Sequence, residues 1–364
     1  MDQNFFLGLP LTVASLWSIL LIMIEASFQK ASLTRQATVL GFVAILLSIL
    51  VLPSEPGFAF SEMIRSGAFT NFSYVIFVLS GLLVVLLSDR YLSEQNINYG
   101  EYYIVLFMSV IGMMLMGAAA NLTILFIGLE LMSISLYVLA GIMRKDMRSN
   151  EAALKYFLLG SFASGFFLYG IALMYGATGE LGLHRMAAFF QTHEPSMMFW
   201  IGLVLLMIGF LFKVSAVPFH QWTPDVYEGA PTTATAFMST GAKAAAFSAV
   251  IVVVTNISDV LSQNPHWRMA LAIIAVLTMI VGNVTALSQP NLKRMLAYSS
   301  IAHAGYMLVG IATQSSMGYS GVLYYALVYT LMNIGAFGVI AHLEQYRKAV
   351  NASDYAGLFK THPL

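Results

Sequence analysis

Eleven apolar runs, separated by short polar connections, constrain this chain more than any other feature. Most are close to the roughly 20 residues that a helix needs to cross a bilayer. Because backbone N–H and C=O groups need internal partners there, these runs are expected to be helices. We predict an all-α integral membrane protein, a polytopic bundle of about eleven transmembrane helices, the second of them short. The predicted spans are 5–26, 37–52, 70–88, 101–120, 122–143, 151–175, 197–217, 231–256, 267–288, 295–314 and 319–343.

The composition agrees with a membrane protein and excludes several kinds of chemistry. Hydrophobic residues make up 59% of the chain and charged residues only 9%, against about a quarter charged in soluble domains. The 17 basic and 17 acidic residues balance, so we expect no nucleic-acid partner. Without cysteine, the chain can hold neither disulfides nor thiolate-bound iron–sulfur clusters. The sequence also has no H-E-x-x-H motif, and His303 and His342 are expected at different depths, which argues against haem. We expect no cofactor and no metal in this chain, and any redox chemistry belongs to partners.

Basic residues in the connections predict the orientation. If the amino terminus lies outside, eleven basic residues fall in inner connections and three in outer ones, as the positive-inside rule requires. The start, MDQNFFLGLP, has no basic stretch, so the run that follows is predicted to be a transmembrane helix and not a cleaved signal. The inner set is Lys30, Arg35, Arg90, Arg144, Lys145, Arg148, Lys293, Arg294, Arg347, Lys348 and Lys360, and the outer set is Arg65, Arg185 and Arg268.

The stretch KVSAVPFHQWTPDVYEGAPTTATAFMSTGAK places two lysines inside apolar segments, at Lys213 and Lys243. A lysine at bilayer depth costs roughly 2.5–3.5 kcal/mol, so each needs a partner, a wet cavity or a function. Pro218, Pro224 and Pro231 interrupt the helix between them. Backbone groups freed in this way are tolerated only beside protein or internal water. We predict a broken helix near Pro218 that lines a hydrated cavity.

Other polar groups point to proton transfer. Thr232, Thr235 and Ser239 precede Lys243 on an otherwise apolar helix, and a desolvated lysine can exchange its proton. Glu130 lies in the fifth span, with Ser133 and Tyr137 on the same helix face. We interpret Glu130, Lys213 and Lys243 as proton-transfer residues. The alternatives are a buried acid held by hydroxyls or kept protonated, and lysines in structural ion pairs.

Two further candidates are Lys155 and His303. Lys155 is near the inner end of its span, where a lysine reaches the interface easily, so an ion-pair role is a strong alternative. His303 is either a relay that titrates near neutral pH or a satisfied core histidine. It has hydroxyl groups at helical spacing on Ser299, Ser300 and Tyr306. His220, Asp225 and Glu228 belong either to an interface or to an inner entry, and the sequence does not decide between them.

An internal repeat is visible at low similarity. NLTILFIGLELMSISLYVLAGI from Asn121 aligns with NLKRMLAYSSIAHAGYMLVGI from Asn291. The predicted orientation makes the two copies inverted, which is typical of transporters. We divide the chain into amino-terminal helices at 1–100, a first five-helix repeat at 101–258, and a second, incomplete repeat at 266–364.

Four stretches carry a resemblance to a known family. They are GLELMSISLYVLAG around Glu130, ALKYFLLGS from Ala153, VPFHQWTPDVYEGAPTTATAFMSTGAK, and LSQPNLKRMLAYSSIAHAGY. The chain resembles the antiporter-like membrane subunits of bacterial respiratory complex I, the proton-pumping NADH:quinone oxidoreductase. The resemblance extends over essentially the whole chain. The family goes on to a second broken helix with another lysine and two more spans, which are not in this sequence.

The resemblance implies a fold of fourteen transmembrane helices with two inverted five-helix repeats, each forming half of a proton path. It implies that Glu130 pairs with Lys213, that Lys243 is the central lysine of the next helix, and that Lys155 matches a lysine on the sixth helix. The partners would be other membrane-arm subunits, including other antiporter-like ones. FMN, iron–sulfur clusters and quinone would belong to partner subunits, and the amino terminus would be periplasmic at the bacterial inner membrane.

The function expected from the resemblance is therefore proton translocation, driven by redox chemistry elsewhere in the complex. One alternative is a subunit of a multi-subunit sodium/proton antiporter, which resembles the same fold. Another is a passive scaffold in the membrane, but scaffolding requires none of the buried charges at Glu130, Lys213 and Lys243.

Overall fold

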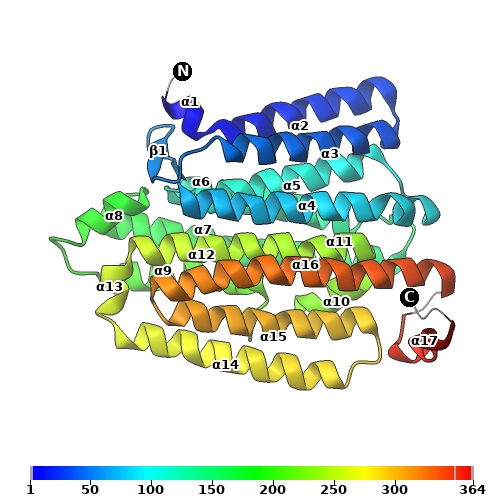
Figure 1. Cartoon of the computed structure of the whole chain (residues 1–364). Helices are drawn as coiled ribbons and strands as arrows, with labels where there is room; N and C mark the ends of the chain where they lie inside the picture. Colours follow the sequence, from blue (N-terminus) through cyan, green and yellow to red (C-terminus); the bar gives the residue numbers. More distant parts are fainter. Residues whose placement is uncertain (1–2, 348–349, 362–364) are drawn as a thin grey trace.

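The computed structural model describes residues 3–347 and 350–361 and is nearly all helical (Figure 1). In these residues, eleven helical stretches are long and apolar enough to cross a membrane, as predicted. Ten are α2 (Leu9–Phe28), α3 (Ala31–Leu50), α4 (Ala68–Glu94), α5 (Gly100–Ala118), α6 (Leu122–Ala140), α7 (Met147–Thr178), α9 (Met197–Val214), α14 (Pro265–Leu287), α15 (Leu292–Ala312) and α16 (Ser316–Arg347). The eleventh is Thr232–Asn256, made of α11 (Thr232–Phe237), a π-helical turn (Met238–Ala242) and α12 (Lys243–Asn256).

The second span is longer than predicted. It begins at Ala31 and has 20 residues, so the expectation of a short helix from 37 was wrong. Its first turns are polar, but those side chains have partners on other helices. Thr34 donates a hydrogen bond to Glu25, and Arg35 forms an ion pair of 3.1 Å with Asp89.

The remaining elements gather at the two ends of the bundle (Figure 1). One end, called here the hairpin end, holds α1 (Gln3–Leu7), α8 (Leu183–Phe189), α13 (Ser258–Ser262) and the antiparallel pair β1 (Gly57–Ala59) and β2 (Ile64–Ser66). The other, called the α10 end, holds α10 (Trp222–Gly229) and α17 (Leu358–Thr361), which follows a 3-10 turn at Ala352–Tyr355. The connections predicted to be inner lie at the α10 end. Lys348 lies outside the described residues.

Glycines let the helices that carry candidate residues pack closely. A Cβ on Gly112 of α5 would lie 2.5 Å from the Met132 backbone nitrogen of α6. Likewise, a Cβ on Gly170 of α7 would lie 2.6 Å from the Gly202 carbonyl oxygen of α9. Small residues at such crossings allow backbone-to-backbone approach in membrane bundles. These contacts fix α6, which carries Glu130, and α9, which carries Lys213.

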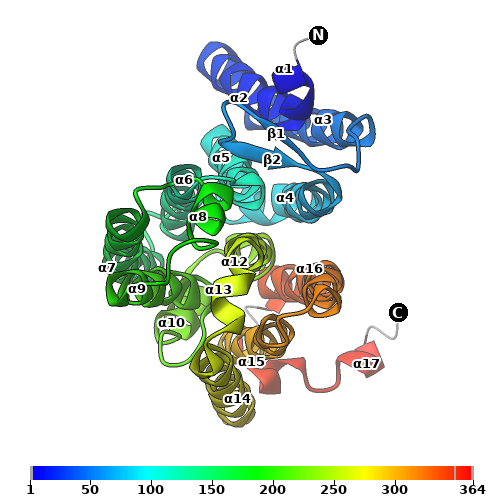
Figure 2. The same cartoon turned by 90° about the vertical axis from the view of Figure 1, so that its left-hand side faces the viewer.

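The helix Thr232–Asn256 forms the buried centre of the bundle. The most apolar part of this helix is wholly buried in the bundle. Its second half, α12, contacts α4, α5, α9, α15 and α16. Figure 2 shows α12 enclosed by the surrounding helices. The break before it is as predicted, since α9 ends at Val214, Pro218 lies in the connection and α10 begins at Trp222. Polar groups on this helix are therefore shielded from lipid.

The starts of the two aligned segments have the same local structure. Asn121 caps α6 by accepting from the Thr123 N–H, and Asn291 caps α15 by accepting from the Arg294 N–H. Each asparagine also forms an antiparallel bridge, with Gly182 and Asn351 respectively. This parallel is in accord with an internal repeat. The division at 101–258 and 266–364 stays a prediction.

Candidate functional site: two buried lysines beside a broken helix

Lys213 lies in the last turn of α9 inside an aromatic pocket. Its side chain is buried, and Nζ donates a hydrogen bond of 3.2 Å to the Tyr137 hydroxyl. Nζ also lies 5.2 Å, 5.5 Å and 5.7 Å from the ring centroids of Tyr137, Tyr156 and Phe212. Aromatic faces attract an ammonium group, by about 2 kcal/mol or more when it is desolvated. The pocket therefore stabilises a cation without an ion pair.

Glu130 does not form the expected direct pair with Lys213. Its carboxylate accepts a hydrogen bond of 2.5 Å from the Ser164 hydroxyl of α7, while Lys213 bonds to Tyr137. Tyr137 is seven residues further along α6, which is about 10 Å along the helix axis. The hydroxyl of Tyr137 is therefore the group that α6 brings to Lys213. Glu130 still acts on Lys213 electrostatically.

Lys243 is the first residue of α12 and is 1% exposed. Its Nζ donates to the Ser300 carbonyl oxygen at 2.9 Å and to the Ser300 hydroxyl at 2.5 Å. A charged lysine has three N–H donors, whereas a neutral amine has two. The two acceptors on Ser300 are thus enough for the neutral form and leave one donor of the charged form open. This site suits a lysine that exchanges its proton.

The π-helical turn Met238–Ala242 directly precedes Lys243. A π turn inserts one residue into a helix, and such turns are frequent at functional sites. Within it, Thr240 hydrogen bonds to Ser80 of α4 at 2.9 Å, and Ser239 accepts from Asn333 of α16 at 2.8 Å. The predicted polar stripe therefore continues onto neighbouring helices. Nothing in the sequence marked this turn.

His303 lies in a group of tyrosines, about one turn along α15 from Ser300, the partner of Lys243. Its Nδ1 hydrogen bonds to the Tyr325 hydroxyl at 2.5 Å, and its ring is 4.9 Å from that of Tyr329. The Tyr329 hydroxyl accepts from Asn333 at 2.9 Å. We missed Asn333, Tyr325 and Tyr329, all on α16. A lone asparagine in the middle of an apolar span was the signal that could have identified this helix face.

A second buried lysine group was also missed. We placed Lys293 in an inner connection, but it lies in the first turn of α15, is buried, and donates to the Ala230 carbonyl oxygen at 2.6 Å. Nearby, Thr232 donates to Glu344 of α16 at 2.6 Å. Positive charge counting treats all loop lysines alike, so it could not distinguish Lys293 from a solvated residue.

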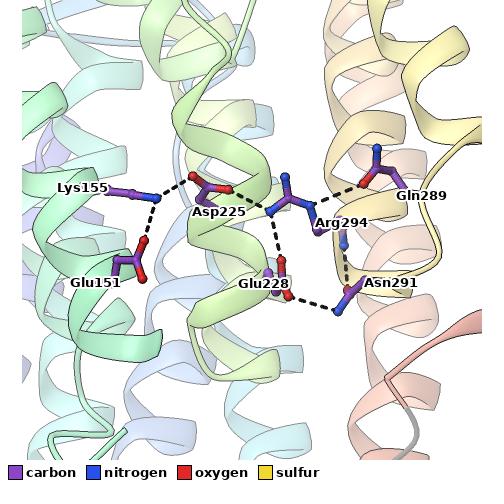
Figure 3. Close-up of polar contacts among 7 residues, drawn as sticks. All are labelled: Glu151, Lys155, Asp225, Glu228, Gln289, Asn291 and Arg294. Atoms are coloured by element: carbon purple, nitrogen blue, oxygen red, sulfur yellow. Dashed lines mark hydrogen bonds and ion pairs between the residues drawn. The ribbon is translucent and has the colours of Figure 1, made fainter. Parts of the chain in front are cut away.

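Lys155 belongs to an ion-pair network at the α10 end (Figure 3). Its Nζ is 2.7 Å from Glu151 and 2.8 Å from Asp225 of α10. Arg294 of α15 contacts the same Asp225 at 2.7 Å and Glu228 at 2.9 Å. The side chain of Lys155 is 41% exposed, so it is separate from the buried lysines. This arrangement favours the ion-pair interpretation of Lys155, and its part in proton transfer stays a prediction.

The network, called here the α10 clamp, comprises Glu151, Lys155, Asp225, Glu228 and Arg294. Burial raises the pKa of Asp225, but hydrogen bonds from Lys155 and Arg294 outweigh burial and leave that pKa below its usual value. Asp225 is therefore ionised at neutral pH. His220, in the break, is half-buried, and burial lowers its pKa. The structure joins Asp225 and Glu228 through Arg294, and His220 has no part in the clamp.

Comparison with known proteins identifies the family. Residues 119–364 match the family model of the NADH:quinone oxidoreductase/Mrp antiporter transmembrane region, which is more than half of the chain. The chain belongs to this family. The chain aligns over its whole length with NADH-quinone oxidoreductase subunit N 1 of Chloroherpeton thalassium. The two are 59% identical, and the alignment covers 77% of that protein. The chain is 39% identical to subunit N of Magnetococcus marinus, covering 100% of this chain and 76% of that protein. The chain thus spans about three quarters of these relatives.

Two solved structures have a similar fold. A chain of respiratory complex I from Thermus thermophilus superimposes with a TM-score of 0.82 at 34% identity, over 97% of this chain and 75% of that one. A chain of an archaeal membrane-bound sulfane sulfur reductase gives the same TM-score, over 99% of this chain and 74% of that one. Its identity is only 24%, so this match shows likeness of fold alone. All five candidate residues lie within the matched region 119–364. In the part of the chain that the structure describes, no three His, Asp or Glu residues gather as a metal site.

Proposed function

We propose that this chain is the N-type, proton-translocating membrane-arm subunit of a bacterial NADH:quinone oxidoreductase. The observation that carries the proposal is the pair of buried lysines, Lys213 and Lys243, each hydrogen bonded to hydroxyl or carbonyl oxygen and neither in an ion pair with an acid. An ion pair would hold a lysine in its charged form. A hydroxyl serves both forms, because it can donate or accept.

Each candidate residue has a role in this proposal. Lys213 takes and releases a proton, and the negative charge of Glu130 favours its charged form. The Tyr137 hydroxyl is the direct partner of Lys213, so it is the nearest group for the transfer. Lys243 repeats this role beside Ser300, with His303 and its tyrosines as further relay groups. Lys155 acts at the α10 end, where protons would enter.

Partner subunits supply the driving force in this proposal. NADH oxidation and quinone reduction, with FMN and iron–sulfur clusters, take place in those subunits. Their conformational or electrostatic changes reach this chain through neighbouring membrane-arm subunits, other antiporter-like ones among them. The amino terminus is periplasmic and the α10 end faces the cytoplasm of the bacterial inner membrane, in line with the distribution of basic residues.

A sodium/proton antiporter subunit is the second candidate, because the family description names both kinds of protein. The site favours protons. Sodium needs several oxygen ligands, and an adjacent ammonium group repels it. The three acidic residues of the α10 clamp are each already paired with Lys155 or Arg294.

The test is redox-driven pumping by the complex in liposomes. We expect Lys213→Ala, Lys243→Ala and Glu130→Gln each to assemble and to lower the proton-pumping rate at least about tenfold. Lys145→Ala, at an exposed lysine of the α10 end, is the control and should pump normally. Wild-type pumping by both lysine variants would refute the proposal. Sodium-dependent transport by the wild-type complex would instead favour the antiporter.

A further inference from the structure

Tyr227 is a buried polar residue to which the proposed function assigns no role. It lies on α10 and is fully buried. Its hydroxyl makes no hydrogen bond with any residue that the structure describes. Leaving a buried hydroxyl without a partner costs about 1–3 kcal/mol, so such a group in a tightly packed protein requires an explanation.

On one side, Tyr227 connects to the pocket of Lys213. Its ring packs edge-on against Trp222, with centroids 6.3 Å apart, and Trp222 stacks on Tyr156 at 4.4 Å. The Tyr156 ring is one of the three that surround the Lys213 ammonium group. Tyr227 and Tyr156 thus pack against the same Trp222 ring.

On the other side, Tyr227 faces the surroundings of Lys243. Its hydroxyl lies beside the Ser300 side chain, just outside a formal hydrogen bond, and is also near Tyr329. Ser300 holds the Lys243 ammonium group through both its carbonyl and its hydroxyl oxygen. The Tyr227 ring also packs against Phe337 of α16, at a centroid distance of 6.4 Å. Tyr227 is therefore placed between the two lysine pockets.

The backbone of Tyr227 is held in place. Its carbonyl oxygen accepts a hydrogen bond of 3.2 Å from the Thr235 hydroxyl of the central helix. Asp225 and Glu228, two residues before and one after, anchor α10 through the α10 clamp (Figure 3). A fixed backbone with an unbonded hydroxyl leaves rotation about the C–O bond as the main freedom of the polar group.

We propose that Tyr227 is a proton-relay residue that connects Lys213 to Lys243. Its hydroxyl accepts a proton from one side as it releases its own proton to the other, so the phenol is neutral before and after the transfer. Because no hydrogen bond joins the hydroxyl to a residue that the structure describes, water molecules complete the path on both sides. This inference rests on the proposed function and adds one residue to it.

The test is Tyr227→Phe, which removes the hydroxyl and keeps the ring. We expect the complex to assemble on a native gel and the proton-pumping rate in liposomes to fall about tenfold. Tyr103→Phe is the matched control. Tyr103 is also fully buried, donates to Asn98 at 2.9 Å and lies in α5, so its variant should pump at the wild-type rate.

Two results separate this inference from the proposed function. If Lys213→Ala and Lys243→Ala abolish pumping while Tyr227→Phe pumps normally, the relay is refuted and the function stands. If the lysine variants also pump normally, the function itself fails. Should Tyr227→Phe fail to assemble, a ring-fluorinated tyrosine at this position provides the second test. A relay then changes the pumping rate at fixed pH, because the fluorinated hydroxyl releases its proton more easily, and an unchanged rate refutes it.

Discussion

The α10 clamp offers a quantitative test of how the break is held, through Arg294→Gln. This change removes contacts of 2.7 Å to Asp225 and 2.9 Å to Glu228. Exposed ion pairs contribute about 0.2–1 kcal/mol, whereas stranding one partner of a buried pair costs about 3–5 kcal/mol. The Arg294 side chain is 29% exposed, between these cases. We therefore expect Arg294→Gln to destabilise the subunit by about 1–3 kcal/mol.

Lys155→Gln is the matched comparison. After this change Asp225 keeps Arg294, and Glu151, which is 63% exposed, returns to solvent. After Arg294→Gln, by contrast, Glu228 keeps only a 3.4 Å hydrogen bond from Asn291. We expect the cost of Lys155→Gln to stay below about 1 kcal/mol. The prediction that Arg294→Gln costs more stability than Lys155→Gln does not depend on the absolute values.

The assay is the thermal midpoint of the purified complex in detergent, with assembly checked on a native gel. Raising the ionic strength from about 0.05 M to about 0.5 M should narrow the difference between wild type and Arg294→Gln, because salt screens partly exposed charges. The lowered pKa of Asp225 gives a second signature. The stabilisation that Asp225 contributes should be complete above about pH 4, the pKa of an aspartate in the unfolded chain. It should be lost as the pH falls through the lower pKa of Asp225 in the folded protein. A larger effect of Lys155→Gln, or no dependence on salt, would refute this account of the clamp.

Two further predictions concern orientation and packing. Single cysteines at Lys145 and Ser262, in a chain that has none of its own, should label from the cytoplasmic and the periplasmic side respectively, and labelling from one side would overturn the orientation. Gly170→Ala should destabilise the α7–α9 crossing by about 1–3 kcal/mol through overpacking. Gly165→Ala on the same helix, with open space at its Cβ, should be neutral in the same thermal assay. Equal midpoints for these two variants would show that the crossing relaxes freely.

The number and order of spans followed from the sequence because helix length and hydropathy are local properties. The break at Pro218 was predictable for the same reason, since proline acts on its own backbone. The start of the second span was not, because Thr34 and Arg35 look like loop residues until Glu25 and Asp89 are placed beside them. Local patterns therefore established the architecture and left its polar ends open.

The candidate site was predicted residue by residue but not contact by contact. The free-energy cost of a lysine inside the bilayer was enough to single out Lys213 and Lys243, because this cost does not depend on which partners surround the residue. The partners of these lysines, Tyr137 and Ser300, depend on side-chain directions across helices. Glu130 illustrates the difference, because being in the right helix did not bring its carboxylate to Lys213. The resemblance also implied this pairing, and the structure places a hydroxyl at that position instead.

The chain keeps the ion pairs of the α10 clamp apart from the two lysines of the candidate site, Lys213 and Lys243. The clamp at the α10 end is built from direct carboxylate contacts, which keep the paired groups ionised and fix their positions. In the interior, Lys213 and Lys243 meet hydroxyls, carbonyl oxygen and aromatic faces, which accept an ammonium group and also tolerate its loss. A proton moves readily only between sites of similar free energy, and a close carboxylate would trap it on the lysine. The ion pairs of the clamp thus fix the position of α10. Tyr227, on the same helix, can still turn its hydroxyl between the two lysines.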